Sequence, residues 1–310
     1  MPIVQINHAL PTPDGKPPVA YDGSFKELPP GVTKRRTGES REFDIDILDG
    51  RRLETPLDLT VNGVQFVQHF EPAVDLQSNG LNSEEVIEKY YPQIAEMVCD
   101  ALGSENVKQA IVFDHTIRSI ERRRLGAKET NGENVGGYAN GAHNDNSSDS
   151  VRARIRLLAK SKKDGGSVTF EEPLLSESEA ERILTGHFGV VNVWRHFRRD
   201  YPVQDYPLAL LDAASAKPED FQIAKYIYPH RVGEVVNALH HPHHRWVYYS
   251  EMEYHEALLF KVFDNASELG LASIEESPPH TAHTSFKLPS ATDNTPCRES
   301  IECRVLVEFR

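Results

Sequence analysis

The chain has 310 residues, of which 39% are hydrophobic and 26% charged, a composition typical of a folded globular protein and too apolar for a disordered one. Its 47 acidic residues outnumber its 34 basic residues, which gives a formal net charge of −13. This negative balance argues against nucleic acid as the main partner, because phosphate binding needs a basic face. No apolar run approaches the roughly 18 residues of a membrane-spanning helix, so we expect no membrane association.

The beginning of the chain and its cysteines bear on location and on metal chemistry. Residues 1–15 show neither a basic region nor a long apolar stretch, so we expect no secretory signal and a cytoplasmic protein. Cys99, Cys297 and Cys303 are too few for a disulfide framework and lack the C-x-x-C spacing of a sulfur-bound zinc site. Because 14 histidines are present, any metal here is expected to be held by nitrogen and oxygen.

The first 60 residues are rich in proline, glycine and charge, and they predict an extended N-terminal arm with a strand-like piece at 43–48. Residues 61–110 are expected to form a strand and a helical flank. Within this flank, apolar residues recur at helical spacing over 83–102. Pro92 lies inside that helix and predicts a kink or a broken first half.

The remainder of the chain, 111–310, is expected to form the core of one domain spanning 1–310. Short β-branched or aromatic runs separated by turn signals predict strands. These runs lie at 110–113, 190–194, 208–211, 221–227, 246–249, 257–263 and 301–309. Helical patterns at 150–158 and 177–184 interrupt them, the second beginning with a capping box of Ser176 and Glu179. Neither a βαβ rhythm nor a glycine-rich phosphate loop is present, so the pattern favours a mainly β fold with flanking helices, a jelly roll or barrel.

The sharpest chemical signal is the segment GAHND, which contains His143 and Asp145. Residues two apart in an extended segment point to the same face, so an imidazole and a carboxylate can meet at one point. An H-x-D pair alone is weak, because it often arises by chance. His283, shortly before the final predicted strand, supplies a third candidate ligand. Two histidines and one carboxylate on one face of a metal are the arrangement of non-haem Fe(II) oxygenases.

Arg298 and Ser300 complete this pattern downstream of His283. A 2-oxo acid chelates such an iron through its keto oxygen and adjacent carboxylate, and leaves a position for O2. The far carboxylate of 2-oxoglutarate then needs a fixed charged partner, which the planar fork of Arg298 can supply. The hydroxyl of Ser300 points to the same strand face two residues later. The residues therefore predict Fe(II), 2-oxoglutarate and O2 at one centre.

The chain resembles the fungal gibberellin-desaturase-like and AsaB-like hydroxylase/desaturase family in the motifs HND, HTSF, RESIECRVLVEF, FDHTIR, NVWR, YPLALLDA and RWVYYSEMEYHEALLFKVFD. A bacterial cephem methoxylase component is similar. The resemblance runs from about residue 20 to the C-terminus in the family's order. It implies a double-stranded β-helix of the cupin-like jelly-roll type. It also implies His143, Asp145 and His283 as iron ligands, and Arg298 with Ser300 as the co-substrate clamp.

The activity that this resemblance implies is that of an Fe(II)- and 2-oxoglutarate-dependent dioxygenase. Such an enzyme hydroxylates, desaturates or cyclises a small secondary metabolite by abstracting hydrogen from a C–H bond, and it releases succinate and CO2. Three departures from the family bear on the substrate. His196 follows Arg195 where the family usually reads NVWRP, the HHPHHRW stretch is unusually rich in histidine, and Lys287 with Leu288 stand where acidic residues are common.

Other histidines compete for the ligand roles. His280 lies three residues before His283, and this odd spacing turns the two side chains to opposite faces of a strand, so only one can face the metal. The resemblance favours His283. The HHPHH cluster at 240–244 resembles a metal site by count but shows no obvious carboxylate partner. We interpret it as a solvated loop.

Substrate contacts are expected from residues near these motifs. Arg118 is a candidate for facing the pocket. Arg195 lies on an apolar strand, and because a buried unpaired arginine is rare, it either meets a protein carboxylate or lines the active site. Tyr138, Trp194 and Phe286 are further candidates, with core packing as the alternative for each.

Two other classes of function remain alternatives. One is a non-catalytic, cupin-like β-barrel that binds a small molecule in the same pocket, and the intact ligand set and clamp argue against it. The other is a cupin-like hydrolase or isomerase with a different divalent metal, which has no need of Arg298. The sequence thus predicts a small-molecule substrate and no particular oligomeric state.

Overall fold

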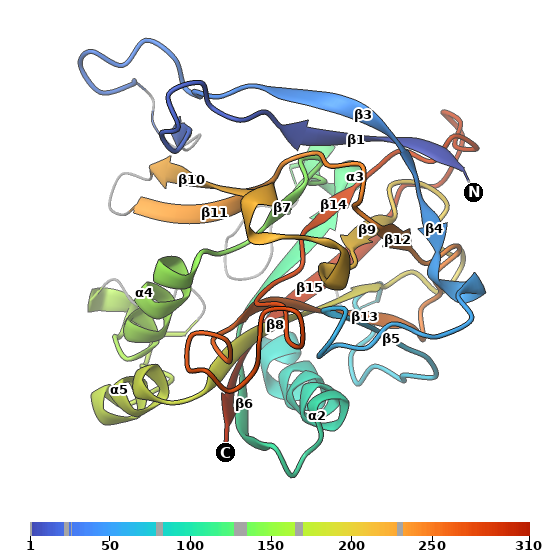
Figure 1. The fold of residues 1–310 in the computed structure, drawn as a ribbon. Helices are drawn as coiled ribbons and strands as arrows, with labels where there is room; N and C mark the ends of the chain where they lie inside the picture. The colour runs from blue at the N-terminus through green and yellow to red at the C-terminus, as the bar shows by residue number, and fades with distance from the viewer. Residues whose placement is uncertain are drawn as a thin grey trace.

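The computed structural model describes residues 2–21, 25, 27–78, 83–126, 135–164, 170–227 and 232–310. Two sheets lie one above the other in the view of Figure 1. The larger sheet contains, in spatial order, β2 (Val19–Tyr21), β10 (Phe221–Ile227), β11 (Val232–Ala238), β7 (His143–Asn144), β14 (His283–Ser285), β9 (Leu208–Leu211), β12 (Trp246–Tyr248) and β4 (Leu48–Asp49). The smaller sheet contains β5 (Val64–Val67), β13 (Ala257–Asp264), β8 (Phe188–His196), β15 (Glu299–Phe309) and β6 (Val107–Ser119).

The strands pair antiparallel throughout the smaller sheet and from β10 to β12 in the larger one, while the edge strands β2 and β4 pair parallel. One apolar cluster fills the space between the sheets, where Phe260 and Leu258 of β13 meet Leu208 and Leu210 of β9. Two sheets closed over a shared core form a jelly roll. The predicted mainly β, double-stranded β-helix fold is confirmed.

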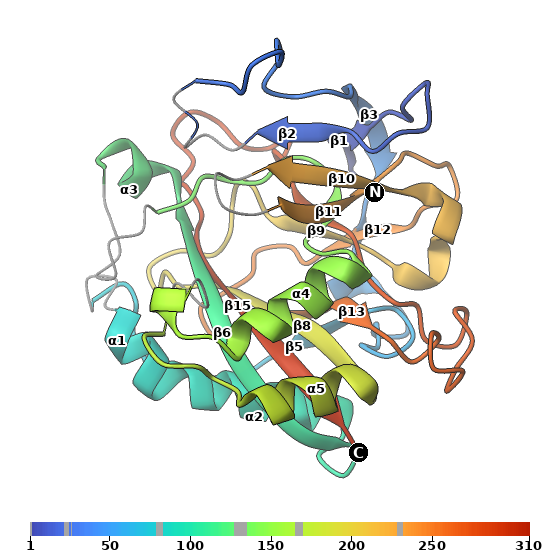
Figure 2. The same cartoon turned by 90° about the vertical axis from the view of Figure 1, so that its left-hand side faces the viewer.

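Two further layers cover the outer faces of the sheets (Figures 1 and 2). A two-stranded ribbon of β1 (Ile3–Ala9) and β3 (Ser40–Asp46) packs Val4 and Ile6 against Trp246 and other apolar residues of the larger sheet. Helix α2 (Tyr91–Leu102) covers the smaller sheet, burying Ile94 and Val98 against its outer face. The central strands of each sheet are therefore buried on both faces, whereas β10 and β11 of the larger sheet keep exposed residues.

The helix expected over 83–102 is interrupted in its first half, as Pro92 predicts. A short α1 (Ser83–Glu85) leads into a π-helix (Val86–Tyr90), and regular helix resumes as α2 with the proline in its first turn. Proline is tolerated there because the first helical N–H groups have no intrahelical acceptor. This prediction is confirmed.

The other helices follow their capping signals. Helix α4 (Ser148–Leu158) begins after Ser147, whose hydroxyl accepts the Ser150 N–H, and α5 (Glu177–Thr185) begins with the predicted capping box. A short α3 (Ile120–Arg124) follows β6. Both α4 and α5 pack at one end of the space between the sheets (Figure 2).

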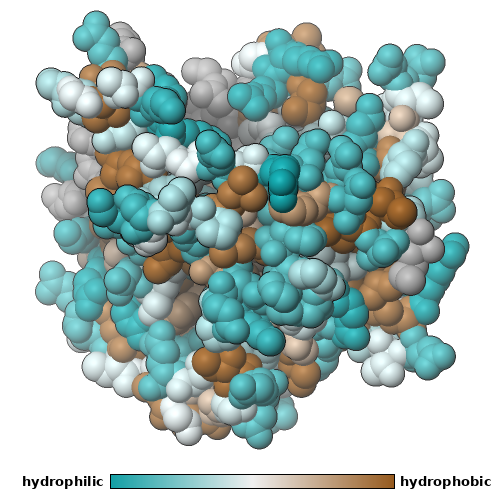
Figure 3. All heavy atoms as spheres, turned by 45° about the horizontal axis from the view of Figure 1, so that its top comes forward, coloured by the Kyte–Doolittle hydropathy of each residue, from teal (hydrophilic) through white to brown (hydrophobic). Residues whose placement is uncertain are grey.

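The predicted strand runs all overlap strands of the structure, and those at 208–211 and 221–227 have the predicted bounds. The run predicted at 246–249 extends one residue past β12. Strands β6 and β15 are longer than predicted, and β11 was missed. In the part of the chain that the structure covers, no helix is long and apolar enough to cross a membrane. Figure 3 shows hydrophilic and hydrophobic side chains interspersed over the face that contains the β1–β3 ribbon.

Candidate metal centre

Three side chains from adjacent strands of the larger sheet converge between the two sheets. His143 of β7 and His283 of β14 are direct cross-strand partners, and their ring centroids lie 4.5 Å apart. Asp145 follows β7, and its Oδ1 lies 3.4 Å from His143 Nε2 and 3.7 Å from His283 Nε2. All three donor atoms lie within 4.8 Å of one another, so one metal ion can contact them together. The structure brings together the three ligands that the sequence predicts.

The two imidazoles present nitrogen lone pairs to this point. His143 Nδ1 donates to the carbonyl oxygen of Gly141 over 2.7 Å, which fixes the proton on Nδ1 and leaves Nε2 free to coordinate. Burial, with a contribution from His143, lowers the pKa of His283 to about 3, so this ring is neutral at neutral pH. Metal ligands must be deprotonated, and His283 fits that requirement. Burial lowers the pKa of His143, but its hydrogen bond with Asp145 raises it above its usual value, so a metal competes with a proton at this ring.

Asp145 is oriented by two donors that the sequence analysis missed. Its Oδ2 accepts hydrogen bonds from Asn192 Nδ2 of β8 over 2.9 Å and from Arg304 Nε of β15 over 3.1 Å. These bonds leave Oδ1 to face the two histidines. Burial raises the pKa of Asp145, but the charge of Arg304 and the bond to His143 hold it well below its usual value. The carboxylate is therefore ionised and points one oxygen at the metal position.

Arg304 is itself held from three sides. It donates to Glu302 Oε1 over 2.9 Å and to Thr116 Oγ1 over 3.0 Å, and it lies 3.5 Å from the Asp114 carboxylate. A signal for it was present in the sequence, because the alternate positions 298, 300, 302 and 304 of the last strand are all polar. Their alternation predicts a polar face that looks into the barrel.

The predicted co-substrate clamp is buried beside this centre. Arg298 is 2% exposed, and its guanidinium lies 4.3 Å from the ring centroid of Tyr138 and 5.4 Å from that of Trp194. One terminal nitrogen donates to the carbonyl oxygen of Tyr206. Among the described residues, Arg298 Nε and Ser300 Oγ have no hydrogen-bond partner. Burial lowers the pKa of Arg298 to about 10, so it is charged at neutral pH.

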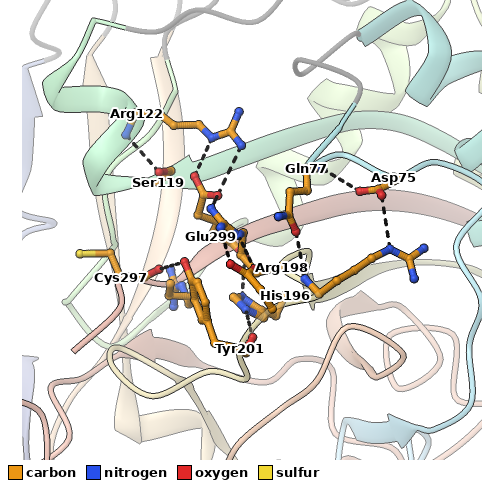
Figure 4. A network of polar contacts seen from close by, with 12 residues as sticks. Asp75, Gln77, Ser119, Arg122, His196, Arg198, Tyr201, Cys297 and Glu299 are labelled. Carbon is orange, nitrogen blue, oxygen red and sulfur yellow. Dashed lines mark hydrogen bonds and ion pairs between the residues drawn. The ribbon is translucent and has the colours of Figure 1, made fainter. Parts of the chain in front are cut away.

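The residues on either side of Arg298 are anchored by a polar network (Figure 4). Glu299 accepts from Arg122 Nε over 2.6 Å and from Arg198 Nη1 over 3.0 Å. Tyr201 OH donates to the carbonyl oxygen of Cys297 over 3.0 Å. Because Cys297 and Glu299 are both held by hydrogen bonds, the backbone on either side of Arg298 is fixed before any ligand binds.

His196, which replaces the proline usual in the family, belongs to this network. Its Nδ1 lies 2.7 Å from the carbonyl oxygen of Glu299, and its Nε2 lies 3.0 Å from that of Tyr201. Burial lowers the pKa of His196 to about 4, so the ring is neutral at neutral pH. The residue connects β8 to the beginning of β15 and is positioned to support the clamp rather than to coordinate the metal.

A cavity of about 560 Å³ opens beside His143. Arg118 and Tyr138 line it from the barrel, and residues 18–20 and 36–40 line it from the N-terminal arm. The guanidinium of Arg118 donates to the carbonyl oxygen of Gly137 over 2.7 Å. A volume of this size accommodates a small organic molecule. Arg118 and Tyr138 therefore line a cavity beside the candidate metal centre, and their contact with a substrate stays a prediction.

The expectation that Arg195 contacts either a carboxylate or the active site is wrong. Asn192 and Trp194 face the barrel interior, so Arg195 faces the α2 side of β8. There its Nε donates to Tyr90 OH over 2.8 Å, and its guanidinium lies 4.9 Å from the Tyr254 ring centroid. Two aromatic rings and backbone carbonyls, rather than a carboxylate among the described residues, surround this buried charge.

The packing of two further residues shows that they lie away from the metal position. Phe286 packs in the core on the outer face of the larger sheet, with its ring centroid 5.5 Å from that of Tyr248, so the core alternative holds. His280 turns away from the metal position and contacts the ring of Phe221, as its odd spacing from His283 predicts.

His241, Pro242 and His243 are exposed, as the interpretation of the HHPHH cluster as a solvated loop predicts, but the expectation that the cluster has no carboxylate partner is wrong. His243 and His244 both contact the carboxylate of Asp220, which is 4% exposed. This partner precedes the cluster by more than twenty residues and was not identified from the sequence.

Known proteins support the fold and identify the family. The family described as "Oxidoreductase/YMDC permease-like domain" matches residues 6–308. The iron and alpha-ketoglutarate-dependent endoperoxidase NvfI has a similar structure, with a TM-score of 0.71 and 21% identity over 100% of this chain and 98% of that chain. This similarity shows the fold.

Curated relatives carry related names. Alpha-ketoglutarate-dependent dioxygenase phiK from a fungal species is 26% identical over 81% of this chain and 79% of that protein. Hydroxylase/desaturase CTB9 from Cercospora beticola is 26% identical over 98% of this chain and 86% of that protein. Aspirochlorine biosynthesis protein N from Aspergillus oryzae is 35% identical over 42% of this chain, and the match spans about half of that relative, 52%. The chain therefore belongs to the oxidoreductase/YMDC permease-like family, and its predicted resemblance to hydroxylase/desaturase enzymes is confirmed.

Proposed function

We propose that this protein is an Fe(II)- and 2-oxoglutarate-dependent dioxygenase that oxidises a C–H bond of a small metabolite. One observation carries the proposal: an open-faced set of two histidines and one carboxylate lies in the same barrel as a buried arginine, Arg298, that forms no ion pair with the described residues. The names of the relatives phiK and CTB9 support this reaction class. The proposal includes a cytoplasmic location and a single catalytic domain.

The residues present fit both groups. His143, Asp145 and His283 offer nitrogen and oxygen donors, which suit Fe(II), and leave the opposite side of the metal free. A buried guanidinium with an unsatisfied Nε is costly unless an anion joins it, and a carboxylate satisfies Arg298 and Ser300 together. Bound there, Fe(II) with 2-oxoglutarate and O2 supplies the oxidising power to remove hydrogen from a C–H bond, with succinate and CO2 as products.

The chain itself supplies geometry and exclusion of water. Asn192 and Arg304 hold the metal-facing oxygen of Asp145 in place, and the Gly141 carbonyl holds the tautomer of His143. Arg298 orients the co-substrate by binding its far carboxylate. The N-terminal arm closes one side of the cavity beside His143, which limits the access of water to the reacting centre.

The test is the release of succinate by anaerobically purified protein supplied with Fe(II), 2-oxoglutarate and then O2. Uncoupled turnover of 2-oxoglutarate gives a readout without a known substrate, and candidate metabolites that fit the cavity are expected to accelerate it. The His143→Ala and Asp145→Ala variants are expected to release none. His255→Ala, at a half-exposed histidine outside the barrel, serves as the control and is expected to behave as wild type. Turnover retained in either ligand variant refutes the proposal and favours a differently metallated or non-catalytic cupin-like protein.

A further inference from the structure

A second set of metal-ligand side chains lies outside the centre described above. Asp220 ends a short 3-10 helix (Pro218–Asp220) directly before β10, and His243 and His244 lie in the turn before β12. One donor atom from each of the three residues lies within 4.8 Å of the others. The set shares no residue with the centre at His143.

One oxygen of the set, Asp220 Oδ2, has three nitrogen atoms within hydrogen-bond distance. Asp220 Oδ2 lies 2.8 Å from His243 Nε2, 3.0 Å from His244 Nε2 and 2.8 Å from the backbone nitrogen of Lys217. A carboxylate oxygen offers two lone pairs, so three N–H donors exceed its capacity. A cation between the carboxylate and the two imidazoles removes this excess, because it accepts a lone pair from each of the three groups and leaves only the Lys217 N–H as a donor.

The backbone holds the two segments together before any ion binds. Leu239 donates its N–H to the carbonyl oxygen of Asp220 over 2.8 Å, at the beginning of the histidine-rich turn. At its end, the N–H of Arg245 donates to Ser215 Oγ over 2.9 Å. Ligands fixed in this way need little reorganisation to bind a metal.

The burial of the three ligands differs in a way that suits an accessible site. The side chain of His244 is 1% exposed and that of Asp220 is 4% exposed, whereas that of His243 is 30% exposed. A cavity of about 480 Å³ adjoins the set and is lined by Asp220, His243 and Glu219. Two ligands therefore form a buried base, and the third lies at the opening through which an ion can enter.

The chemistry of the ligands also suits a cation. Carboxylate and imidazole are both ligand types that bind divalent transition metals. Lys217 and Arg41 line the adjoining cavity together with Glu219, so side chains of both charge signs surround the set.

We propose that Asp220, His243 and His244 bind a divalent transition metal of the Zn²⁺ type at a site separate from the oxygenase centre. Imidazole nitrogen and carboxylate oxygen are favoured Zn²⁺ ligands, at about 2.0–2.2 Å from the ion. Three protein ligands leave a further position for water. At the His143 centre the carboxylate oxygen lies 3.4 and 3.7 Å from the two imidazole nitrogens, whereas Asp220 Oδ2 lies 2.8 and 3.0 Å from those of His243 and His244. The second set therefore has to open by a few tenths of an ångström to admit the ion.

The test is the zinc stoichiometry of chelator-treated full-length protein, measured by titration calorimetry and by metal analysis after desalting. The wild type is expected to bind two equivalents of Zn²⁺, one at each centre. The His243→Gln and Asp220→Asn variants are expected to bind one. His243 is the partly exposed ligand, so its replacement preserves the fold even if the Asp220 variant fails to fold.

Two controls separate this site from its surroundings. The ring of His241 contacts that of His243, with centroids 3.8 Å apart, but His241 is not one of the three ligands, so His241→Gln is expected to retain two equivalents. The His243→Gln variant is expected to keep the wild-type rate of 2-oxoglutarate turnover. The same number of equivalents in His243→Gln as in the wild type overturns the proposal and identifies the cluster as a hydrogen-bonded turn, whereas one equivalent in the wild type and none in His243→Gln means that only the His143 centre fails to bind Zn²⁺.

Discussion

Arg304 Nε donates a hydrogen bond to Asp145 Oδ2 over 3.1 Å, so a charged side chain of the last strand orients the carboxylate of the candidate metal centre. The contact joins the two sheets, because Arg304 lies on β15 and Asp145 follows β7. The contact belongs to a hydrogen-bond network, since Arg304 also donates to Glu302 and Thr116. The centre therefore depends on a side chain that contacts no metal.

Replacement of Arg304 by Gln is expected to weaken metal binding about 10–100-fold, the range seen when a group that supports a ligand is removed. Asp145 then loses its charged donor, and Glu302 is left close to it without a cation between them. The measurement is the Mn²⁺ or Co²⁺ affinity of the folded variant by titration calorimetry. Arg156→Gln, at an arginine of α4 whose side chain is 56% exposed, is the matched control. Unchanged affinity in Arg304→Gln argues that Asn192 alone orients the carboxylate.

Replacement of Arg298 by Ala is expected to raise the KM for 2-oxoglutarate about 10–100-fold, because charge-assisted hydrogen bonds contribute about 1.5–3 kcal/mol. The expected effect of Ser300→Ala is smaller, since that hydroxyl is neutral. Both values come from the succinate assay at varied 2-oxoglutarate. Arg52→Ala removes an arginine whose side chain is 87% exposed and is expected to leave the KM unchanged. An Arg298→Ala enzyme with normal turnover supports the differently metallated alternative.

Replacement of Glu299 by Gln is expected to lower the free energy of unfolding by about 1.5–3 kcal/mol, because it removes the carboxylate that binds Arg122 and Arg198. The same variant is expected to raise the KM for 2-oxoglutarate, since Glu299 anchors the residue next to Arg298. Urea unfolding and the succinate assay measure the two effects. An Arg122→Gln, Glu299→Gln double-mutant cycle isolates the ion pair, and strict additivity in it contradicts the interaction.

The candidate site was predictable where its chemistry is local in sequence. His143 and Asp145 lie two residues apart, as do Arg298 and Ser300, so strand alternation alone places each pair on one face. The distal His283 needed the resemblance to a family to be preferred over His280. The fold class followed from strand runs and turn signals, while β11 was missed because its valines are interrupted by glycine, glutamate and asparagine.

The errors arise from contacts that only the tertiary structure creates. Arg195 was misplaced because both faces of β8 are buried, and an apolar run then gives no sign of which face looks inward. Asp220 was missed as the partner of His243 because strands β10 and β11 separate them in the chain. Arg304 was missed although polar residues alternate toward it from Arg298, because its partner Asp145 lies 159 residues earlier and only the packing of the two sheets brings them together.

Stability at acidic pH is expected to depend on Glu308, at the end of β15. Its carboxylate accepts from Lys108 over 3.0 Å and from two nitrogens of Arg182 over 2.9 Å. Although burial raises its pKa, these bonds lower it from 4.5 to about 2. A carboxyl whose pKa is lower in the folded state stabilises the fold fully above its unfolded pKa, and this contribution falls as the pH drops from 4.5 toward 2.

The Glu308→Gln variant is therefore expected to be less stable than the wild type near neutral pH, and the difference is expected to shrink as the solution is acidified below the unfolded pKa. Urea unfolding of both proteins at a series of pH values measures this difference directly. Glu181→Gln, at an exposed carboxylate 3.8 Å from Arg156, controls for the general loss of a negative charge and is expected to show no such trend. A difference between wild type and Glu308→Gln that stays constant with pH means that the ion pairs of Glu308 do not contribute, because only a lowered pKa in the folded state couples its protonation to unfolding.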